Sequence, residues 1–233
     1  MADHLTEQEQ MEMLKRWWKE RGAQTLLLVV LGVGGWFGWH QWQDYSDSKA
    51  QQASLLYDEM LTLATATDEL NPEQRARVNE LAGVLKEHHG RSQYAHYAGL
   101  VLARMAVLDQ DLEAAETELR AVMQAADDEL AAVAGLRLAR VLAARGAYAE
   151  ALTLLEQDAP TPLASQYAEV RGDIQVLSGD LVAARAAYQL ALDTLGTPDD
   201  NARAVLELKL NQVLLGDVTP QSDADVVSEE NAE

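Results

Sequence analysis

Residues 170–191 read VRGDIQVLSGDLVAARAAYQLA, and this stretch decides the fold class. Apolar residues recur three and four positions apart on both sides of Gly179, a residue that ends one helix before the next begins. Gly172 on the first helix and Ala184 on the second are small, so the two helices can approach closely, and Tyr188 is large enough to fill the space beside them. The stretch therefore predicts an antiparallel helical hairpin.

The same pattern occurs twice more upstream. The small residue of the first helix is Ala103, Ala139 or Gly172, at spacings of 36 and 33 residues, and the period of the tetratricopeptide repeat is about 34 residues. One hairpin cannot bury its apolar face alone, so successive hairpins must stack. An ordinary alanine-rich helical bundle is the alternative, and the spacing shared by three copies favours repeats. We predict an all-α, tetratricopeptide-like stack of helical hairpins over residues 43–216.

Helix-breaking residues recur along this domain and leave helices of about 11–18 residues joined by short turns. The breaks are Asn71-Pro72, His89-Gly90, Gln110-Asp111, Asp127-Asp128, Gly146, residues 160–162, Gly179-Asp180 and residues 196–198. Residues 50–90 are expected to form a further, atypical hairpin, and residues 199–215 a capping helix. Residues 217–233 carry no Lys or Arg and no amphipathic period, which predicts a disordered acidic tail.

A long apolar run precedes the repeats. Residues 23–39, AQTLLLVVLGVGGWFGW, contain no charged side chain, and extension to residue 42 gives 20 residues. Such a helix is about 30 Å long, the thickness of a bilayer core. All five tryptophans lie in or beside the run, which is typical of the interfacial belts of membrane helices. Residues 23–42 are therefore predicted to form a single transmembrane helix after the N-terminal segment 1–22.

The flanking charges predict the orientation of this helix. Lys15, Arg16, Lys19 and Arg21 precede it, and only Lys49 follows it closely. Cationic flanks stay in the cytoplasm, so residues 1–22 are expected in the cytoplasm and residues 43–233 on the other side of the membrane. A cleaved signal peptide is the competing interpretation. A buried core helix fits less well, because the run has no polar stripe.

Two glycines mark one face of the predicted membrane helix. Gly34 and Gly38 form a G-x-x-x-G pair, which lets another helix approach closely. Glycine is also common in membrane helices that make no such contact. Both interpretations stay open from the sequence, and the two residues are our candidates for helix packing in the membrane.

Composition excludes several classes of function. The net charge is −20, which disfavours nucleic acid and anionic lipid as partners, because both need a positive surface. There is no cysteine, and no enzyme, phosphate-binding or cofactor motif is present. His89 and His96 with a nearby carboxylate are a weak alternative as metal ligands. We expect a protein that is not an enzyme and has no cofactor and no metal.

The inner helices of stacked hairpins form a concave face. The repeat register places the following residues on it: Tyr97, Leu100, Arg104, Leu136, Arg140, Gln166, Glu169 and Asp173. This mixture of apolar, aromatic and charged residues suits an extended polypeptide or a partner helix better than a small polar substrate. Solvation of these positions, or their burial by a neighbouring repeat, is the alternative.

The chain resembles a known family, the ancillary subunits of the bacterial SecYEG translocon (YfgM-like inner-membrane proteins), over about residues 5–216. The likeness rests on KRWW at 15–18, LGVGGWFGWHQW at 31–42, SKAQQASLLYDE at 48–59, GLRLARVL at 135–142 and VRGDIQVLSGDLVAARAAY at 170–188.

The resemblance implies one membrane span with a cytoplasmic N-terminus and a periplasmic tetratricopeptide-like domain. It also implies association with the translocon and with a membrane-anchored, prolyl-isomerase-like periplasmic chaperone (PpiD-like). The implied activity is transfer of emerging secretory polypeptides to periplasmic chaperones, and a regulatory link to envelope stress is a weaker implication. The acidic tail departs from the family pattern. The alternative function is a membrane-anchored scaffold for another cell-envelope assembly, since the fold alone does not select the complex.

Overall fold

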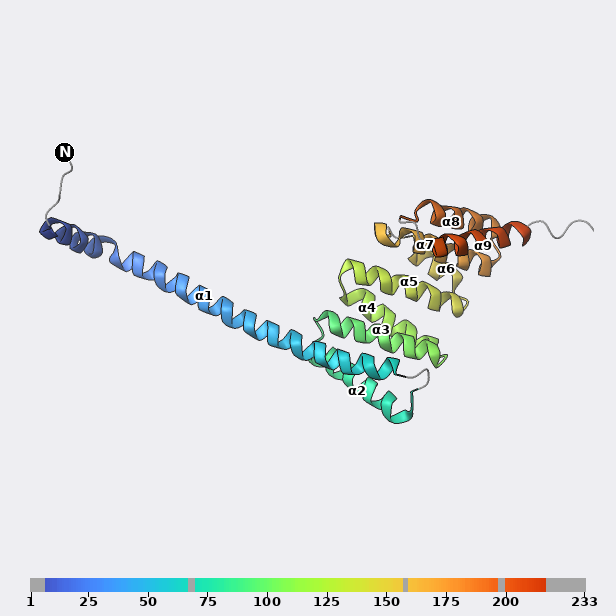
Figure 1. Ribbon diagram of the computed structural model, residues 1–233, viewed down its shortest axis with the longest axis horizontal. Coiled ribbons are helices and arrows are strands. Elements are labelled where there is room, and N and C mark those ends of the chain that lie inside the picture. Colours follow the sequence, from blue (N-terminus) through green and yellow to red (C-terminus); the bar gives the residue numbers. More distant parts are fainter. Residues whose placement is uncertain (1–6, 67–69, 157–158, 197–199, 217–233) are drawn as a thin grey trace, which may run out of the picture. The chain divides into compact units, whose positions relative to one another are not determined.

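A computed structural model describes residues 7–66, 70–156, 159–196 and 200–216, and these residues form helices and turns without a strand (Figure 1). The predicted acidic tail lies outside the described residues. The chain divides into two compact units, Met1–Gln52 and Ala53–Glu233, which we describe separately. The predicted boundary between residues 42 and 43 stays a prediction, whereas the all-helical class is confirmed.

Helix α1 is a single α-helix from Glu7 to Thr65, 59 residues long. The sequence breaks did not predict this continuity. Its physical basis is local, because residues 43–65 contain neither Pro nor Gly and are rich in residues that tolerate a helix. The last turns of α1 therefore belong to the first hairpin of the repeat unit.

In the unit Met1–Gln52 the described aromatic side chains of α1 are exposed. The rings of Trp36 and His40 stack with their centroids 5.4 Å apart. A Cβ added at Gly34 or Gly38 would meet nothing within 4 Å. Within the described part of the chain, no helix combines the length and hydropathy of a candidate membrane span. The side chains at 23–25 and 28–29 lie outside the described ones, and the predicted anchor stays a prediction.

The unit Ala53–Glu233 is a stack of helical hairpins (Figure 1). After α1, its elements are α2 (Pro72–His88), α3 (Gln93–Leu108), α4 (Leu112–Ala125), α5 (Asp128–Ala144), α6 (Tyr148–Leu154), the 3-10 helix η1 (Thr161–Leu163), α7 (Ala164–Ser178), α8 (Leu181–Asp193) and α9 (Asp200–Gly216). The end of α1 pairs with α2, α3 with α4, α5 with α6, and α7 with α8. The predicted breaks are confirmed as far as Gly196, residues 197–198 lie outside the described residues, and the expected capping helix is α9.

Side-chain caps explain where several of these helices begin. Asn71 and Gln74 form a capping box at the start of α2, in which two backbone N–H groups are satisfied reciprocally. The carboxylates of Asp111, Asp127 and Asp180 accept hydrogen bonds from the third residue of α4, α5 and α8 at 2.9–3.0 Å. Acidic residues before helices therefore act as N-caps here.

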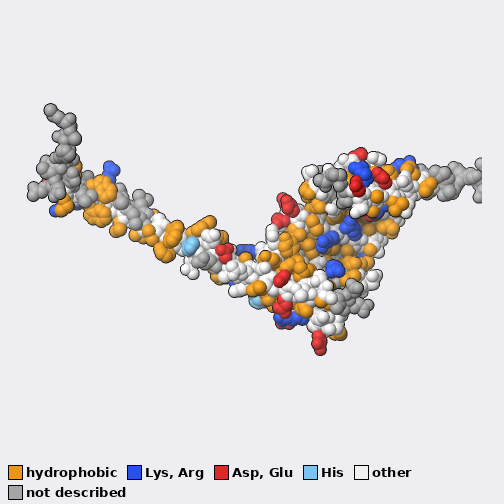
Figure 2. Space-filling view, in the orientation of Figure 1, with side chains coloured by type: hydrophobic (Ala, Val, Ile, Leu, Met, Phe, Trp, Pro, Cys, Tyr) orange, Lys and Arg blue, Asp and Glu red, His pale blue; other side chains and the backbone are white. Residues whose placement is uncertain are grey.

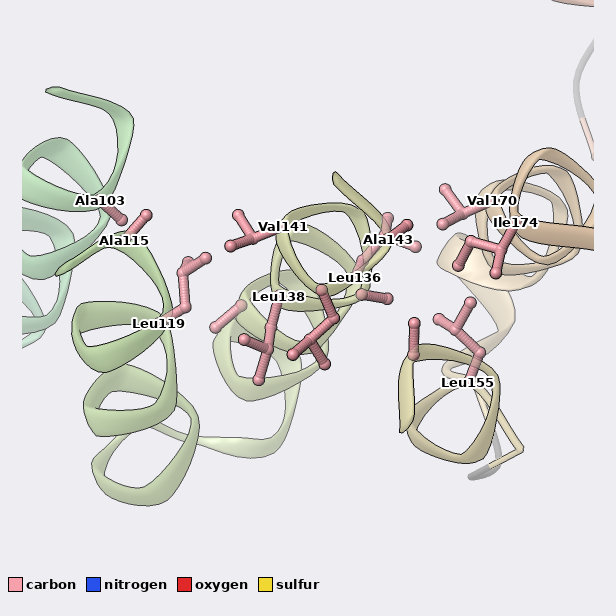
Figure 3. Close-up of a cluster of buried hydrophobic side chains, with 14 of the residues drawn as sticks. Ala103, Ala115, Leu119, Leu136, Leu138, Val141, Ala143, Leu155, Val170 and Ile174 are labelled. Carbon is pink, nitrogen blue, oxygen red and sulfur yellow. The ribbon is translucent and has the colours of Figure 1, made fainter. Parts of the chain in front are cut away.

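Small residues bring the two helices of each hairpin together, as the repeat pattern predicted. Ala115, Ala151 and Ala184 are fully buried. Gly172 lies so close to the second helix of its hairpin that an added Cβ would be 2.5 Å from the ring of Tyr188. Figure 3 shows part of the core between successive hairpins, where Leu119, Leu136 and Leu155 are among the buried side chains.

Candidate peptide-binding groove

Two adjoining cavities lie along the inner helices of the repeat unit, with volumes of about 360 and 350 Å³. They share Leu100, Arg104 and Arg137, and we call the surface that the two cavities make together the inner groove. Its other lining residues are Tyr57, Leu61, Tyr97, Val101, Ala103, Val107, Leu108, Leu112, Leu119, Leu130, Val133, Arg140, Val141 and Ala144. The lining comes from the end of α1, from α3 and α5, and from two residues of α4.

The repeat register explains why arginines face the groove. Arg104 and Arg140 each follow the small residue of their hairpin, Ala103 and Ala139. Successive residues of a helix point about 100° apart. The small side chain can therefore pack inside the hairpin, where Ala103 is 3% exposed and Ala139 is fully buried, while the arginine after it is exposed.

The floor of the groove is apolar. Leu100 and Val141 are largely buried, whereas Val107 and Leu108 at the end of α3 are 37% and 61% exposed. Large apolar side chains exposed next to a cavity are a common feature of binding surfaces in soluble domains. The groove therefore offers an apolar surface that a partner could cover.

Aromatic residues border the end of the groove next to α1. Tyr57 lies 5.8 Å from both Tyr94 and Tyr97, measured between ring centroids. Burial, and secondly the neighbouring Tyr97, raise the pKa of Tyr57, so its phenol keeps its proton at neutral pH. Tyrosine presents an apolar ring and a hydrogen-bonding hydroxyl together, which is why it is enriched in protein interfaces.

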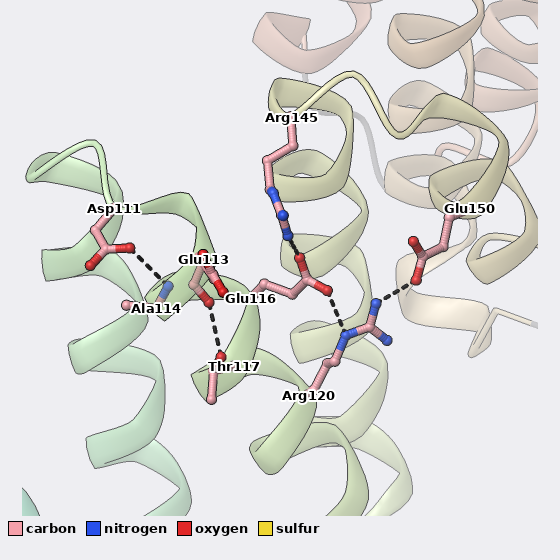
Figure 4. A network of polar contacts seen from close by, with 8 residues as sticks. All are labelled: Asp111, Glu113, Ala114, Glu116, Thr117, Arg120, Arg145 and Glu150. Carbon is pink, nitrogen blue, oxygen red and sulfur yellow. Dashed lines mark hydrogen bonds and ion pairs between the residues drawn. The ribbon is translucent and has the colours of Figure 1, made fainter.

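The groove lining is positively charged although the chain as a whole is acidic. It contains Arg104, Arg137 and Arg140 and neither Asp nor Glu. No ion pair joins these arginines to a carboxylate among the described residues, whereas Arg120 and Arg145 on the same unit share Glu116 (Figure 4). The three guanidinium groups are therefore available to an acidic ligand.

At the other end of the predicted surface, the chain pairs its own charges. Lys209 on α9 donates hydrogen bonds to Glu169 at 2.7 Å and to Asp173 at 2.8 Å. The hydroxyl of Tyr188 donates to Asp173 at 2.8 Å. These two carboxylates are thus engaged by neighbouring helices of the same chain.

The structure brings together four of the eight predicted surface residues: Tyr97, Leu100, Arg104 and Arg140. Gln166 is exposed on α7 but lines neither cavity. Leu136 is 3% exposed and belongs to the same core cluster as Val170 of the next hairpin, so the neighbouring repeat covers it. Glu169 and Asp173 contact α9, as described above. Whether the four clustered residues bind a partner stays a prediction.

Most of the lining residues were absent from the sequence prediction, and Arg137 and Tyr57 are the two polar or aromatic ones among them. Arg137 lies three positions before Arg140 on α5, a spacing that places both on one helix face, and this signal was present in the sequence. Tyr57 lies near the end of α1, outside the three copies of the repeat pattern, so the repeat register did not place it on the inner face.

Metal chemistry has no geometric support in the described part of the chain, where no group of three His, Asp or Glu side chains is close enough to hold an ion. His96 has a buried Nε2 atom without a hydrogen-bond partner. One isolated imidazole is not a metal site, since Zn²⁺ takes three or four ligands from the protein.

Comparisons with known proteins agree with this architecture. A tetratricopeptide repeat-like domain family matches residues 15–214. A relative in Haemophilus influenzae, named an ancillary SecYEG translocon subunit, is 34% identical over 82% of this chain and 91% of its own length. Relatives of the same name in Escherichia coli and Neisseria gonorrhoeae are 29% and 27% identical, each over 91% of this chain and 99% and 100% of their own lengths. No solved structure matches the chain significantly.

Proposed function

Because the chain belongs to the family of ancillary SecYEG translocon subunits, we propose that it is a non-enzymatic, membrane-tethered adaptor at the Sec translocon. It links emerging secretory polypeptides to periplasmic chaperones, among them a membrane-anchored, prolyl-isomerase-like one. The observation that carries this proposal is the similarity to relatives of that name over nearly their entire lengths.

Residues 23–42 serve as the anchor in this proposal. Its support is the uncharged run, the cationic segment before it and the tryptophans at its ends. The N-terminus then lies in the cytoplasm and the repeat unit in the periplasm. Gly34 and Gly38 present an open face on α1, where a helix of the translocon or of the chaperone could pack closely.

The inner groove is the surface for the periplasmic partner. Its support is the apolar floor, the tyrosines at one end and the three arginines without ion pairs. Tethering matters because a weak peptide binder held beside the translocon exit works at a high effective concentration. The adaptor therefore needs no tight intrinsic affinity for each secretory chain.

Topology is tested first with single-cysteine variants, because the chain has no cysteine of its own. Met13→Cys and Ser178→Cys both replace exposed residues. A membrane-impermeant maleimide should label Ser178→Cys in intact spheroplasts and Met13→Cys only after permeabilisation. Labelling of both variants in intact spheroplasts would contradict the anchor and its orientation.

Partner identity is tested by photo-crosslinking in native membranes, with the probe at Gly38 or at Arg140. Crosslinks from Gly38 to translocon or chaperone helices, and from Arg140 to a periplasmic chaperone or a secretory chain, would support the adaptor. A probe at the exposed Leu208 of α9 is the matched control, because it lies outside the groove. Reproducible crosslinks to an unrelated envelope complex would favour the scaffold alternative instead.

The glycine face has its own test. Replacing Gly34 and Gly38 together by leucine should weaken co-purification with the translocon in mild detergent, because close helix approach is lost. Gly32→Leu is the control, since residue 32 lies about 200° around the helix from residue 34. Unchanged co-purification of the double variant would remove the glycine face from the proposal.

A further inference from the structure

We propose that the inner groove selects polypeptide segments in which acidic residues flank bulky apolar ones. The inference rests on the proposed role of this groove as the partner-binding surface, and it adds the chemistry of the segment that is bound. It is carried by the arginines of the lining, by their place in the repeat, and by the apolar floor between them.

The first observation is the positive charge of the groove. The chain has 38 acidic and 18 basic residues, yet the lining of both cavities contains three arginines and no carboxylate. Arg75, Lys86 and Arg145 elsewhere on the unit each pair with an acidic side chain. Arg104, Arg137 and Arg140 have no such pair among the described residues. Carboxylates of a bound partner therefore form ion pairs with them. Guanidinium groups bind carboxylates through two parallel hydrogen bonds, which gives selectivity as well as affinity.

The second observation is the charged residue at one position of the repeat. Arg104, Arg140 and Asp173 each follow the small residue of their hairpin, so the inner face changes sign between the second and third of these hairpins. Lys209 of α9 pairs with Asp173 and Glu169, and the charge of the acidic end is therefore partly compensated within the chain. Only the basic end stays open to a partner.

The third observation is the apolar floor, which favours a peptide with apolar side chains over a simple polyanion as the ligand. Leu100, Val107 and Leu108 lie beside the arginines, and Tyr57 and Tyr97 continue the surface toward α1. Figure 2 shows the same combination on one face of the repeat unit, where blue cationic side chains are set within an orange hydrophobic region. A polyanion such as nucleic acid would not cover this floor and would be repelled by the acidic remainder of the chain.

The test measures binding of two synthetic peptides by fluorescence anisotropy, with the full chain in non-ionic detergent. The first peptide alternates pairs of leucine or phenylalanine with pairs of glutamate, and the second carries lysine in place of every glutamate. The glutamate peptide should bind at least about tenfold more tightly, and its affinity should fall as salt is raised. Equal or tighter binding of the lysine peptide would overturn the inference.

Variants of the groove arginines test whether the peptide binds in the inner groove. Arg137→Gln combined with Arg140→Gln should lower the affinity for the glutamate peptide by about tenfold or more, because two charge-assisted contacts are lost. Arg203→Gln, an exposed arginine of α9 outside the groove, should leave the affinity unchanged. Equal losses in both variants would mean a general charge effect and would overturn the groove as the site.

The acidic residues 217–233 of the chain itself are a competing occupant. Binding that appears only when these residues are deleted would assign the groove to the chain's own tail and would overturn the assignment to a partner. The outcome is separable from that of the proposed function. Loss of translocon crosslinks from Gly38 with intact selectivity for the glutamate peptide would contradict the adaptor role alone.

Discussion

Lys209 on α9 donates hydrogen bonds to both carboxylate oxygens of Asp173 on α7, at 2.8 and 2.9 Å. The same ammonium contacts Glu169 at 2.7 Å and lies 5.9 Å from the centroid of the Tyr188 ring. One cation from the last helix thus joins the acidic and aromatic residues of the hairpin before it. This contact closes one end of the inner face and leaves the arginine end open.

The stabilisation that this contact provides should decrease at alkaline pH. Burial lowers the pKa of the Lys209 ammonium, but its bonds to Asp173 and Glu169 outweigh burial and raise the pKa above the ordinary 10.5. Burial, with the hydrogen bond to Asp173, raises the pKa of Tyr188 as well. Both groups hold their protons more tightly in the folded chain, so their stabilisation is complete below about pH 10 and is lost as the pH rises further.

The contribution of these two groups to the free energy of unfolding should be constant between about pH 7 and 9 and should fall above about pH 10. Urea unfolding followed by circular dichroism measures it. In Tyr188→Phe the loss above pH 10 should be smaller, because one of the two groups no longer titrates. An alkaline loss identical in the variant and the original chain would contradict the contribution of Tyr188.

Removing the cation should loosen α9. Lys209→Met leaves two partly buried carboxylates without a counter-charge, and we expect a loss of about 1–2 kcal/mol in the free energy of unfolding. Limited proteolysis should cut α9 sooner than in the original chain. Arg203→Met on the same helix is the matched control and should change neither quantity, because the side chain is exposed.

Gly172 should tolerate no larger residue. In Gly172→Ala the new Cβ would lie 2.5 Å from the ring of Tyr188, so the hairpin of α7 and α8 must open, at a cost of about 1–3 kcal/mol. Gly83→Ala on α2 is the opposite case, because nothing lies within 4 Å of its added Cβ. It should stabilise the chain by about 0.5–1 kcal/mol, the helix-propensity gain of alanine over glycine. Thermal unfolding of the two variants should therefore shift in opposite directions.

The ion-pair network between successive hairpins should contribute modestly. Glu116 on α4 accepts from Arg120 at 2.8 Å and from Arg145, and Arg120 also reaches Glu150 (Figure 4). A double-mutant cycle with Glu116→Gln and Arg145→Met should give a coupling of about 0.5–1 kcal/mol, because both arginines are partly exposed. The coupling should shrink at high salt, and a value that salt does not change would show that packing, not charge, joins the two residues.

Local patterns were enough to predict the helical hairpins. Gly146 and Gly179 end their helices in the left-handed region, with φ of 79° and 89°, which glycine adopts without steric cost. Gly172, Ala184 and Tyr188 alternate small and large residues within a single hairpin, so their contact follows from sequence spacing. The 59-residue continuity of α1 was missed, because the absence of a break over residues 43–65 is a weaker signal than the presence of one.

The sequence by itself thus determined the helical class, the breaks and the repeat register, since these depend on residues within one hairpin or its turn. Only the tertiary structure decided which inner-face residues are open. Leu136 is buried with residues of the next hairpin, and Asp173 is paired with a lysine 36 residues away. Arg104 and Arg140 stay unpaired in the groove because no carboxylate from a neighbouring helix reaches them among the described residues. The physical reason is that burial and pairing depend on contacts between distant segments, which helix periodicity does not encode.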